Sequence, residues 1–320
     1  MLEKCGCNYF NYSENGVYTP VSGICWTASF LPGIFWLLYR YSGDKEFMEG
    51  AVRYEKAMDK AFSDFDGLSH DVGFMWLLTS GQNFALTGSD ESRRRLLKAA
   101  HVLMGRFNIA GNYIRAWNFD HMKGQAIIDC MMNIPLLFLA SEITGDMRFH
   151  NAAAAYAATA LNYLIREDGS VHHVMCFDHV SGKHTGYDKG AGYDENSAWS
   201  RGAGWAIYEM AMAYMYTKEL RFLEAAKKVS AYFTEHLNSD GVAPWDFKAP
   251  VDRDITDTSA CMIAASGMLE IYRITDDAKY RSSAVTLIEN VLNKYSCLDD
   301  NSEQLIGDGT VEMARNKGIM

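Results

Sequence analysis

Long apolar segments alternate with amphipathic segments through most of the chain. Each apolar segment closes on a short polar signature, such as Gly43-Asp44 or Gly145-Asp146, and an amphipathic segment follows. Such a signature supplies a left-handed stop for one helix and an N-cap for the next, so the unit predicts two successive helices. The predicted pairs are 26–42 with 47–62, 71–87 with 90–107, 125–143 with 147–166, 197–217 with 219–237, and 257–274 with 277–295.

Repetition of one helical pair is typical of a stacked or ring-shaped helical array. The pattern predicts an all-α toroid, an α/α barrel with apolar inner helices and amphipathic outer helices. Strand-like alternation is nearly absent and no low-complexity linker interrupts the chain, so residues 1–320 are expected to form a single domain. The starts of all inner helices would then meet at one mouth. Those starts carry Trp26, Asp71, Asp129, Trp199, Arg201 and Asp257.

Composition and charge narrow the function. The net charge of −10 argues against a nucleic-acid partner, which needs a basic surface. No apolar run reaches the length of a membrane span, and the N-terminal residues do not resemble a signal peptide. The seven Cys are scattered and odd in number, with Cys5 and Cys7 too close together for a metal clip. Reduced thiols and a cytoplasmic location are expected. The sequence does not indicate an oligomeric state.

Two aspartates are candidates for acid chemistry. Asp129 lies among apolar residues with Gln125 and Asn133 four positions on either side, so a helix would place all three on one face. It is equally well explained as a capping residue, and capping is the simpler explanation for Asp71, which His70 precedes. If both carboxylates face one another across the mouth, repulsion would raise one pKa and provide a general acid. Two acids in an aromatic cleft are typical of sugar cleavage.

Arg201 begins an inner helix, where a cation is electrostatically unfavourable. A bound carboxylate would resolve this conflict, and so would an ion pair with Asp194 or Glu195. The Trp residues offer flat faces for sugars, but about half of them are expected to be structural. The His residues have no metal-site spacing, and the adjacent pair His172-His173 is typical of a solvated loop within 169–196.

Several motifs together resemble the unsaturated glucuronyl hydrolases, glycoside hydrolase family 88. The resemblance extends from about residue 20 to about residue 310. It rests on Trp26-Thr-Ala-Ser-Phe30-Leu-Pro-Gly33, His70-Asp71-Val-Gly-Phe74-Met, Ile127-Ile-Asp129-Cys-Met-Met-Asn133, Trp199-Ser-Arg201-Gly, Pro244-Trp-Asp246-Phe and Asp257-Thr-Ser-Ala260.

The resemblance implies an (α/α)6 barrel that removes a Δ4,5-unsaturated uronic acid from the non-reducing end of lyase-generated oligosaccharides, without a metal or organic cofactor. It implies hydration of a vinyl ether, in which an acid protonates C4 and water adds at C5. Asp129 matches the family's general acid/base and Asp71 its second essential Asp. The positions that match the sugar subsite are Trp26, Phe30, His70, Trp117, His173, Trp199, Arg201 and Trp205.

The chain also departs from the family pattern. Ala191 and Ala203 stand where many members carry Gln. Both ends look short, and five inner helices are expected where the family has six, so an incomplete, open barrel is a hypothesis. Glycosaminoglycan fragments are the expected substrates. The alternatives are an unsaturated rhamnogalacturonyl hydrolase acting on pectin fragments, an inactive sugar-binding toroid and, more remotely, a sugar epimerase.

Overall fold

The computed structural model describes residues 9–14, 16–21, 25–250, 255–297, 303–312 and 317–319. Cys5 and Cys7 therefore lie outside the described residues. Among the described residues no helix is both long and apolar enough to cross a membrane. The described Cys residues are free thiols: Cys25, Cys130, Cys176, Cys261 and Cys297.

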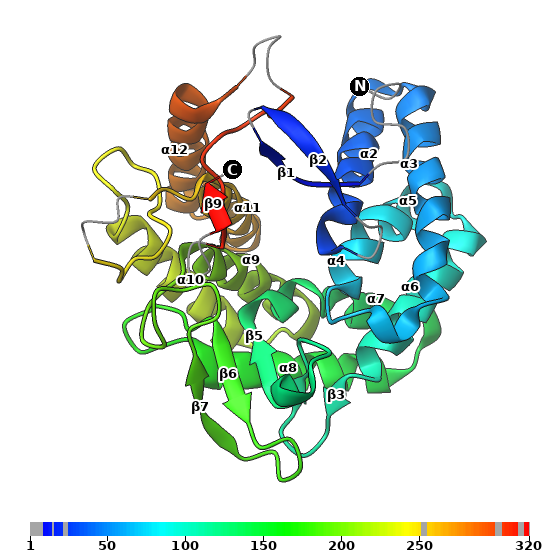
Figure 1. Cartoon of the computed structure of the whole chain (residues 1–320), viewed down its shortest axis with the longest axis horizontal. Helices are drawn as coiled ribbons and strands as arrows, with labels where there is room; N and C mark the ends of the chain where they lie inside the picture. Colours follow the sequence, from blue (N-terminus) through cyan, green and yellow to red (C-terminus); the bar gives the residue numbers. More distant parts are fainter. Residues whose placement is uncertain are drawn as a thin grey trace.

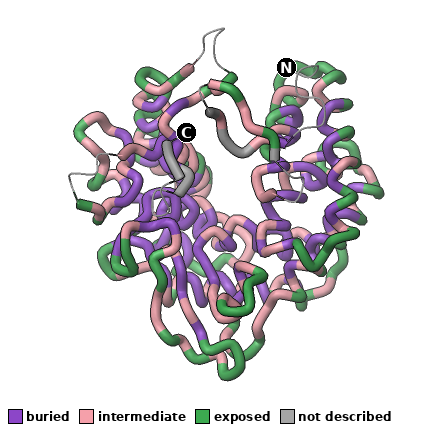
Figure 2. The backbone as a smooth tube through the Cα atoms, viewed as in Figure 1, coloured by how far each residue is buried: buried purple, intermediate pink, exposed green. Residues whose placement is uncertain are grey.

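Helical pairs follow one another around a ring, as Figure 1 shows. The outer helices are α3 (Lys45–Ala57), α6 (Asp90–Met104), α8 (Met147–Leu164), α10 (Leu220–Glu235) and α12 (Ala278–Tyr295). The inner layer contains α2 (Phe30–Ser42), α4 (Val72–Trp76), α5 (Gln82–Thr87), α7 (Pro135–Thr144), α9 (Ser200–Thr217) and α11 (Thr258–Thr275). The predicted toroid of five helical pairs is confirmed for the described part of the chain, and its buried residues concentrate along the inner ring (Figure 2).

The signature between the paired helices behaves as the sequence predicts. Gly43, Gly88 and Gly145 end inner helices with positive φ. The carboxylates of Asp44 and Asp146 accept hydrogen bonds from backbone N–H groups in the first turn of the outer helices. The helix predicted over 197–217 begins three residues later. Its N-cap is Trp199, and Ser197, where a cap would be expected at the start of that segment, donates its hydroxyl to the Asp194 carbonyl oxygen in the preceding loop.

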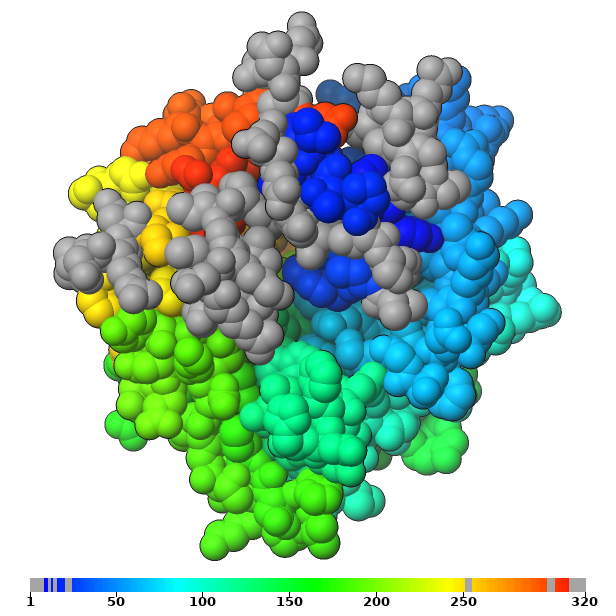
Figure 3. Space-filling model, in the orientation of Figure 1, coloured from blue at the N-terminus to red at the C-terminus, as the bar shows by residue number. Residues whose placement is uncertain are grey.

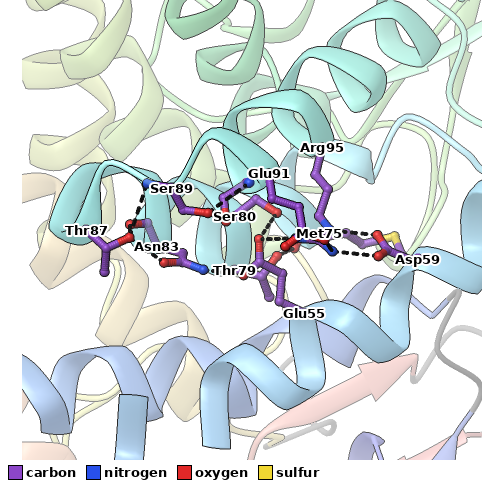
Figure 4. A network of polar contacts seen from close by, with 11 residues as sticks. Glu55, Asp59, Met75, Thr79, Ser80, Asn83, Thr87, Ser89, Glu91 and Arg95 are labelled. Atoms are coloured by element: carbon purple, nitrogen blue, oxygen red, sulfur yellow. Dashed lines mark hydrogen bonds and ion pairs between the residues drawn. The ribbon is translucent and has the colours of Figure 1, made fainter. Parts of the chain in front are cut away.

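The second inner helix is interrupted, because a π-helical turn, η4 (Leu77–Gly81), separates α4 from α5. Beneath it, Glu55 is 1% exposed and accepts hydrogen bonds from the Ser80 hydroxyl and the Asn83 amide, each at 2.6 Å (Figure 4). Arg95 lies 3.5 Å from Glu55 and also binds Asp59 through both of its carboxylate oxygens. The network anchors the irregular turn to α3 and α6.

Short strands occupy several connections between the helices, and they include residues 125–127, which the pattern assigned to a helix. β5 (Gln125–Ile127), β6 (Val174–Phe177) and β7 (His184–Asp188) form an antiparallel three-stranded sheet in the order β5-β6-β7. β3 (Phe107–Asn108) pairs with β4 (Tyr113–Ile114). The expectation that 169–196 is an irregular loop is therefore wrong for β6 and β7, whose alternation is too short to stand out in the sequence.

A hairpin of β1 (Tyr9–Glu14) and β2 (Val17–Val21) lies between the first and last helical pairs (Figure 1). Its turn contacts the segment after α12. The Ser13 hydroxyl donates to Gln304 at 2.8 Å, and the Glu303 amide donates to the Gly16 carbonyl oxygen at 2.7 Å. The blue hairpin and the orange-red segment meet in the space-filling view (Figure 3). A second hairpin pairs β8 (Thr310–Glu312) with β9 (Lys317–Ile319).

Candidate active site

The starts of the inner helices supply the candidate side chains. Trp26 opens a 3-10 turn, η1 (Trp26–Ser29), that leads into α2. Asp71 directly precedes α4, and Asp129 lies in the 3-10 turn η6 (Ile128–Met132) before α7. Trp199 and Arg201 stand at the start of α9. Because consecutive inner helices begin on the same side of a toroid, these residues share one mouth.

Aromatic side chains connect three of the helical pairs across this mouth. The Trp26 ring centroid lies 5.5 Å from that of Phe30 and 5.4 Å from that of Phe74. Phe74 in turn lies 5.3 Å from Trp205 of α9. Phe30 is 37% exposed, whereas Phe74 and Trp205 are each 4% exposed. The four rings form a continuous apolar wall, of a kind that binds the flat faces of sugar rings.

Asp129 lies beside an imidazole. The Nε2 atom of His173 is 3.2 Å from Oδ2 of Asp129, with both side chains largely buried. Neither atom has a well-aligned hydrogen-bond partner in the described part of the chain. The two atoms are therefore close enough for a hydrogen bond, but the angle at the hydrogen is unfavourable. The Ile128 amide donates to the His173 carbonyl oxygen at 3.0 Å, which fixes the two segments together. The His173 ring also packs against Trp199 at 4.5 Å.

The pKa of Asp129 lies below its ordinary value. Burial by itself raises it, but the nearby His173, His70 and Arg201 together have the larger effect and lower it. The expectation that carboxylate repulsion raises a pKa at this site is therefore wrong for Asp129. The physical reason is that basic groups outweigh the effect of burial at this carboxyl.

Asp71 occupies the N-cap position of α4, but its side chain makes no capping hydrogen bond. Its Oδ2 atom accepts from the Ser69 hydroxyl at 2.8 Å, and its Oδ1 atom lies 3.4 Å from Nε2 of His70. The simpler explanation of Asp71 as a cap is thus wrong. Burial lowers the pKa of His70, although Asp71 and Asp129 act in the opposite direction. A neutral His70 thus lies near both carboxylates.

Asn133 links the turns that carry the two aspartates. Its Oδ1 atom accepts from the Phe74 amide at 2.7 Å, and its amide group donates to the Asp129 carbonyl oxygen at 3.2 Å. A Cβ on Gly73 would collide with the Asn133 backbone, so only glycine permits this close approach. The expectation that Gln125 shares a helix face with Asp129 and Asn133 is wrong, because Gln125 lies in β5.

Arg201 is held by several acceptors. Its Nη1 atom lies 3.5 Å from Oδ2 of Asp257 and donates to the Ser259 hydroxyl at 3.1 Å and to the Thr310 carbonyl oxygen at 2.6 Å. Its guanidinium carbon lies 4.8 Å from the centroid of the Trp199 ring. Among the described residues its carboxylate partner is Asp257, so the expected pairing with Asp194 or Glu195 is wrong.

Three buried ring nitrogens at the mouth have no hydrogen-bond partner among the described residues: Nδ1 of His70 and the indole nitrogens of Trp199 and Trp205. Buried polar atoms are usually paired, because an unmade hydrogen bond is costly. A ligand rich in hydroxyl groups could satisfy all three. The site therefore combines apolar faces, polar groups and a carboxylate beside an imidazole.

The remaining candidates lie nearby or in the core. Trp117 is half-buried and packs against the small cluster of Ala116, Ile127 and Val174. His172 is 8% exposed and stacks on Tyr187 at 3.8 Å, where burial lowers its pKa to about 4. The expectation of a solvated His172-His173 pair is thus wrong. Phe74 belongs to the wall but was not singled out from the sequence, although its place three residues after Asp71 was a usable signal.

Comparison with known proteins identifies the class. The sequence profile of Glycosyl Hydrolase Family 88 matches residues 7–243, and the chain belongs to this family of glycoside hydrolases. The chain is 33% identical to the unsaturated glucuronyl hydrolase of Bacillus sp. (strain GL1), over 95% of this chain and 83% of that protein.

A solved structure and a second relative agree with this assignment. The crystal structure of the Bacillus sp. GL1 unsaturated glucuronyl hydrolase, responsible for the degradation of glycosaminoglycan, superposes with a TM-score of 0.94 at 31% identity. The superposition covers 98% of this chain and 87% of that one. The unsaturated chondroitin disaccharide hydrolase of Streptococcus pyogenes serotype M1 is 31% identical, over 90% of this chain and 74% of that protein.

Proposed function

We propose that this glycoside hydrolase removes a Δ4,5-unsaturated uronic acid from the non-reducing end of glycosaminoglycan-type oligosaccharides produced by lyases. The observation that carries the proposal is the Asp129 carboxyl, which lies beside His173 at an aromatic mouth that also holds a buried arginine. Relatives named for unsaturated glucuronyl and chondroitin disaccharide substrates support the same class of substrate.

The reaction is a hydration of the C4=C5 vinyl ether. Asp129, in its protonated form, gives its proton to C4, and the positive charge that develops is shared by C5 and the ring oxygen. Water adds at C5 as the Asp129 carboxylate takes a proton from it, which restores the protonated acid, and the resulting hemiketal opens and expels the aglycone. Asp71 is the second carboxylate, placed to stabilise the cationic transition state or orient the water.

The substrate itself adjusts Asp129. A bound uronate brings a negative charge into the mouth and engages the Arg201 guanidinium, so less positive potential acts on Asp129. Both effects raise the pKa of Asp129 and favour the protonated form that the reaction needs. Binding of the anionic sugar would therefore favour the protonated form of Asp129 that the reaction requires.

The other candidate residues would bind the sugar. Arg201 would pair with the uronate carboxylate, for which its planar fork is suited. Trp26, Phe30 and Trp205 would cover the ring faces, and His70, Trp117, His173 and Trp199 would complete the subsite. No metal or organic cofactor takes part in these steps, and each is assigned to a side chain of this chain. We also propose that residues 1–320 act as one catalytic domain in the cytoplasm.

The test is the ultraviolet absorbance of an unsaturated chondroitin or hyaluronan disaccharide incubated with the protein, because hydration removes the conjugated double bond. Wild-type protein should remove the absorbance and Asp129→Asn should not. Loss only on an unsaturated rhamnogalacturonan disaccharide would move the substrate to pectin fragments. No loss on either substrate would refute the proposal, and intact sugar binding without turnover would then identify an inactive sugar-binding toroid.

A further inference from the structure

The backbone of a distant loop holds the imidazole that faces Asp129. The Ala191 amide donates a hydrogen bond to Nδ1 of His173 at 2.8 Å. An N–H group can donate only to an unprotonated ring nitrogen, so Nδ1 is the acceptor of this imidazole. In the neutral ring the proton then resides on Nε2, the atom that lies 3.2 Å from Oδ2 of Asp129. The geometry thus assigns the tautomer of His173.

The Ala191 peptide is itself held from its other side. Its carbonyl oxygen accepts a hydrogen bond from the indole Nε1 of Trp245 at 3.0 Å. Trp245 is 1% exposed, and its own carbonyl oxygen accepts from the amide and hydroxyl of Ser200, each at 3.0 Å. The indole is therefore fixed relative to the start of α9, the same helix that carries Arg201.

The rest of the loop supports this arrangement. Gly190 has a φ of 53°, and a Cβ there would collide with the His173 imidazole. The buried carboxylate of Asp246 accepts from the Tyr193 amide at 3.0 Å and from the Ala198 amide at 2.9 Å. The chain that follows Ala191 is thus fastened to Asp246 at residues 193 and 198, and residue 190 has no Cβ to obstruct the ring.

We propose that Trp245, acting through the Ala191 peptide, is a positioning residue that fixes His173 in its Nε2–H tautomer so that the ring presents a donor to Asp129. This inference deepens the proposed function, because it rests on Asp129 as the acid. The opposite tautomer would turn the Nε2 lone pair toward Oδ2. A proton on the Asp129 carboxyl would then be shared with the imidazole instead of remaining available to C4.

The charged and titratable groups around Asp129 and His173 must stay unchanged when Trp245 is substituted. His70, Arg201 and His173 act on Asp129, and Asp129 and His70 lie near His173. Trp245→Phe alters none of these groups, because it removes the indole N–H and one of the two fused rings and preserves an aromatic ring in the core. Trp36→Phe is the matched control. Trp36 is fully buried, and its indole nitrogen has no partner among the described residues.

The experiment combines nuclear magnetic resonance with kinetics on the full chain. Protein labelled with 15N-histidine reports the protonation of each ring nitrogen, and His173→Gln assigns the His173 signals. We expect an unprotonated Nδ1 and a protonated Nε2 in wild type and in Trp36→Phe. In Trp245→Phe we expect a mixture of tautomers. Its kcat should fall about three- to tenfold with little change in KM, the effect of one lost hydrogen bond.

The outcomes separate this inference from the proposed function. A wild-type His173 protonated on Nδ1, or a tautomer and kcat unaffected by Trp245→Phe, would overturn the positioning role. An equal loss of kcat in Trp36→Phe would overturn it too. If the wild type shows the Nε2–H tautomer but no turnover of any unsaturated disaccharide, the proposed function fails while the assigned tautomer stands.

Discussion

Glu209 makes the stability of the barrel depend on pH. It lies on α9, two turns after Arg201, and is 3% exposed, with its Oε2 atom lacking a partner in the described part of the chain. Burial, and after it the nearby Glu270, raise the pKa of Glu209 well above its ordinary value. The folded protein therefore holds this carboxyl protonated at pH values where the unfolded chain has already ionised it.

The sign and size of the effect follow from proton linkage. Below the pKa of an unfolded-chain Glu, about 4.3, both states are protonated and the group does not alter stability. Above it the folded state binds more protons than the unfolded state, so stability falls as pH rises, until the folded pKa is passed. Within this window the limiting slope is about 1.4 kcal/mol per pH unit, or about 2.7 kcal/mol over two units.

Glu209→Gln should remove this slope, because glutamine has nearly the same shape and no charge to desolvate. Urea unfolding of wild type and variant at several pH values from 5 to 8 gives the difference in unfolding free energy. We expect the variant to gain on the wild type as pH rises. Glu235→Gln, at an exposed position at the end of α10, serves as the control and should show no such trend. A constant difference between wild type and Glu209→Gln across the range would refute the reasoning.

Three further substitutions test separate parts of the structure. Glu55→Ala should destabilise the protein by about 3–5 kcal/mol in urea unfolding, because Ser80 and Asn83 lose a charged acceptor beside a buried arginine; a loss below about 1 kcal/mol would show that the network is dispensable. Arg201→Lys should raise KM for an unsaturated disaccharide about tenfold with a smaller change in kcat, and an unchanged KM in initial-rate kinetics would contradict carboxylate binding. Asp71→Asn should lower kcat about a hundredfold or more without lowering the melting temperature, and near-normal turnover would exclude an essential role.

Local signals explain why the helical ring could be predicted from the sequence. Gly at a helix end and Asp at the next N-cap act over a few residues, and the periodicity of apolar residues follows from burial on one helix face. Asp44 and Asp146 therefore cap the predicted helices. Pro135 begins α7, so this inner helix starts later than the predicted residue 125 and Asp129 lies in the turn before it.

Features set by tertiary contacts could not be predicted from local pattern. The π-helical turn depends on Glu55, 25 residues from Ser80 in the chain, and no periodicity in 71–87 indicates it. Asp71 occupies a capping position, but its carboxylate turns to Ser69 and His70 instead. Local pattern did not indicate His173 either, and only the resemblance to a known family named it as a subsite residue.

The contacts that position His173 could not be predicted from the sequence for the same reason. Ala191 is 18 residues from His173, and Trp245 is 54 residues from Ala191. Neither separation produces a pattern in the sequence, and Trp245 could be interpreted as a sugar platform as readily as a core residue. Only the folded chain shows that its indole donates to a backbone carbonyl oxygen.

The central claim, that Asp129 protonates C4 of an unsaturated uronic acid, is tested most directly by running the reaction in D2O and examining the products by nuclear magnetic resonance. The account predicts one deuteron at C4 of the released sugar and loss of the C4=C5 bond with wild-type protein, and neither change with Asp129→Asn. Release of the aglycone with the double bond intact and no deuterium at C4 would contradict it, because the glycosidic bond would then be cleaved by ordinary displacement.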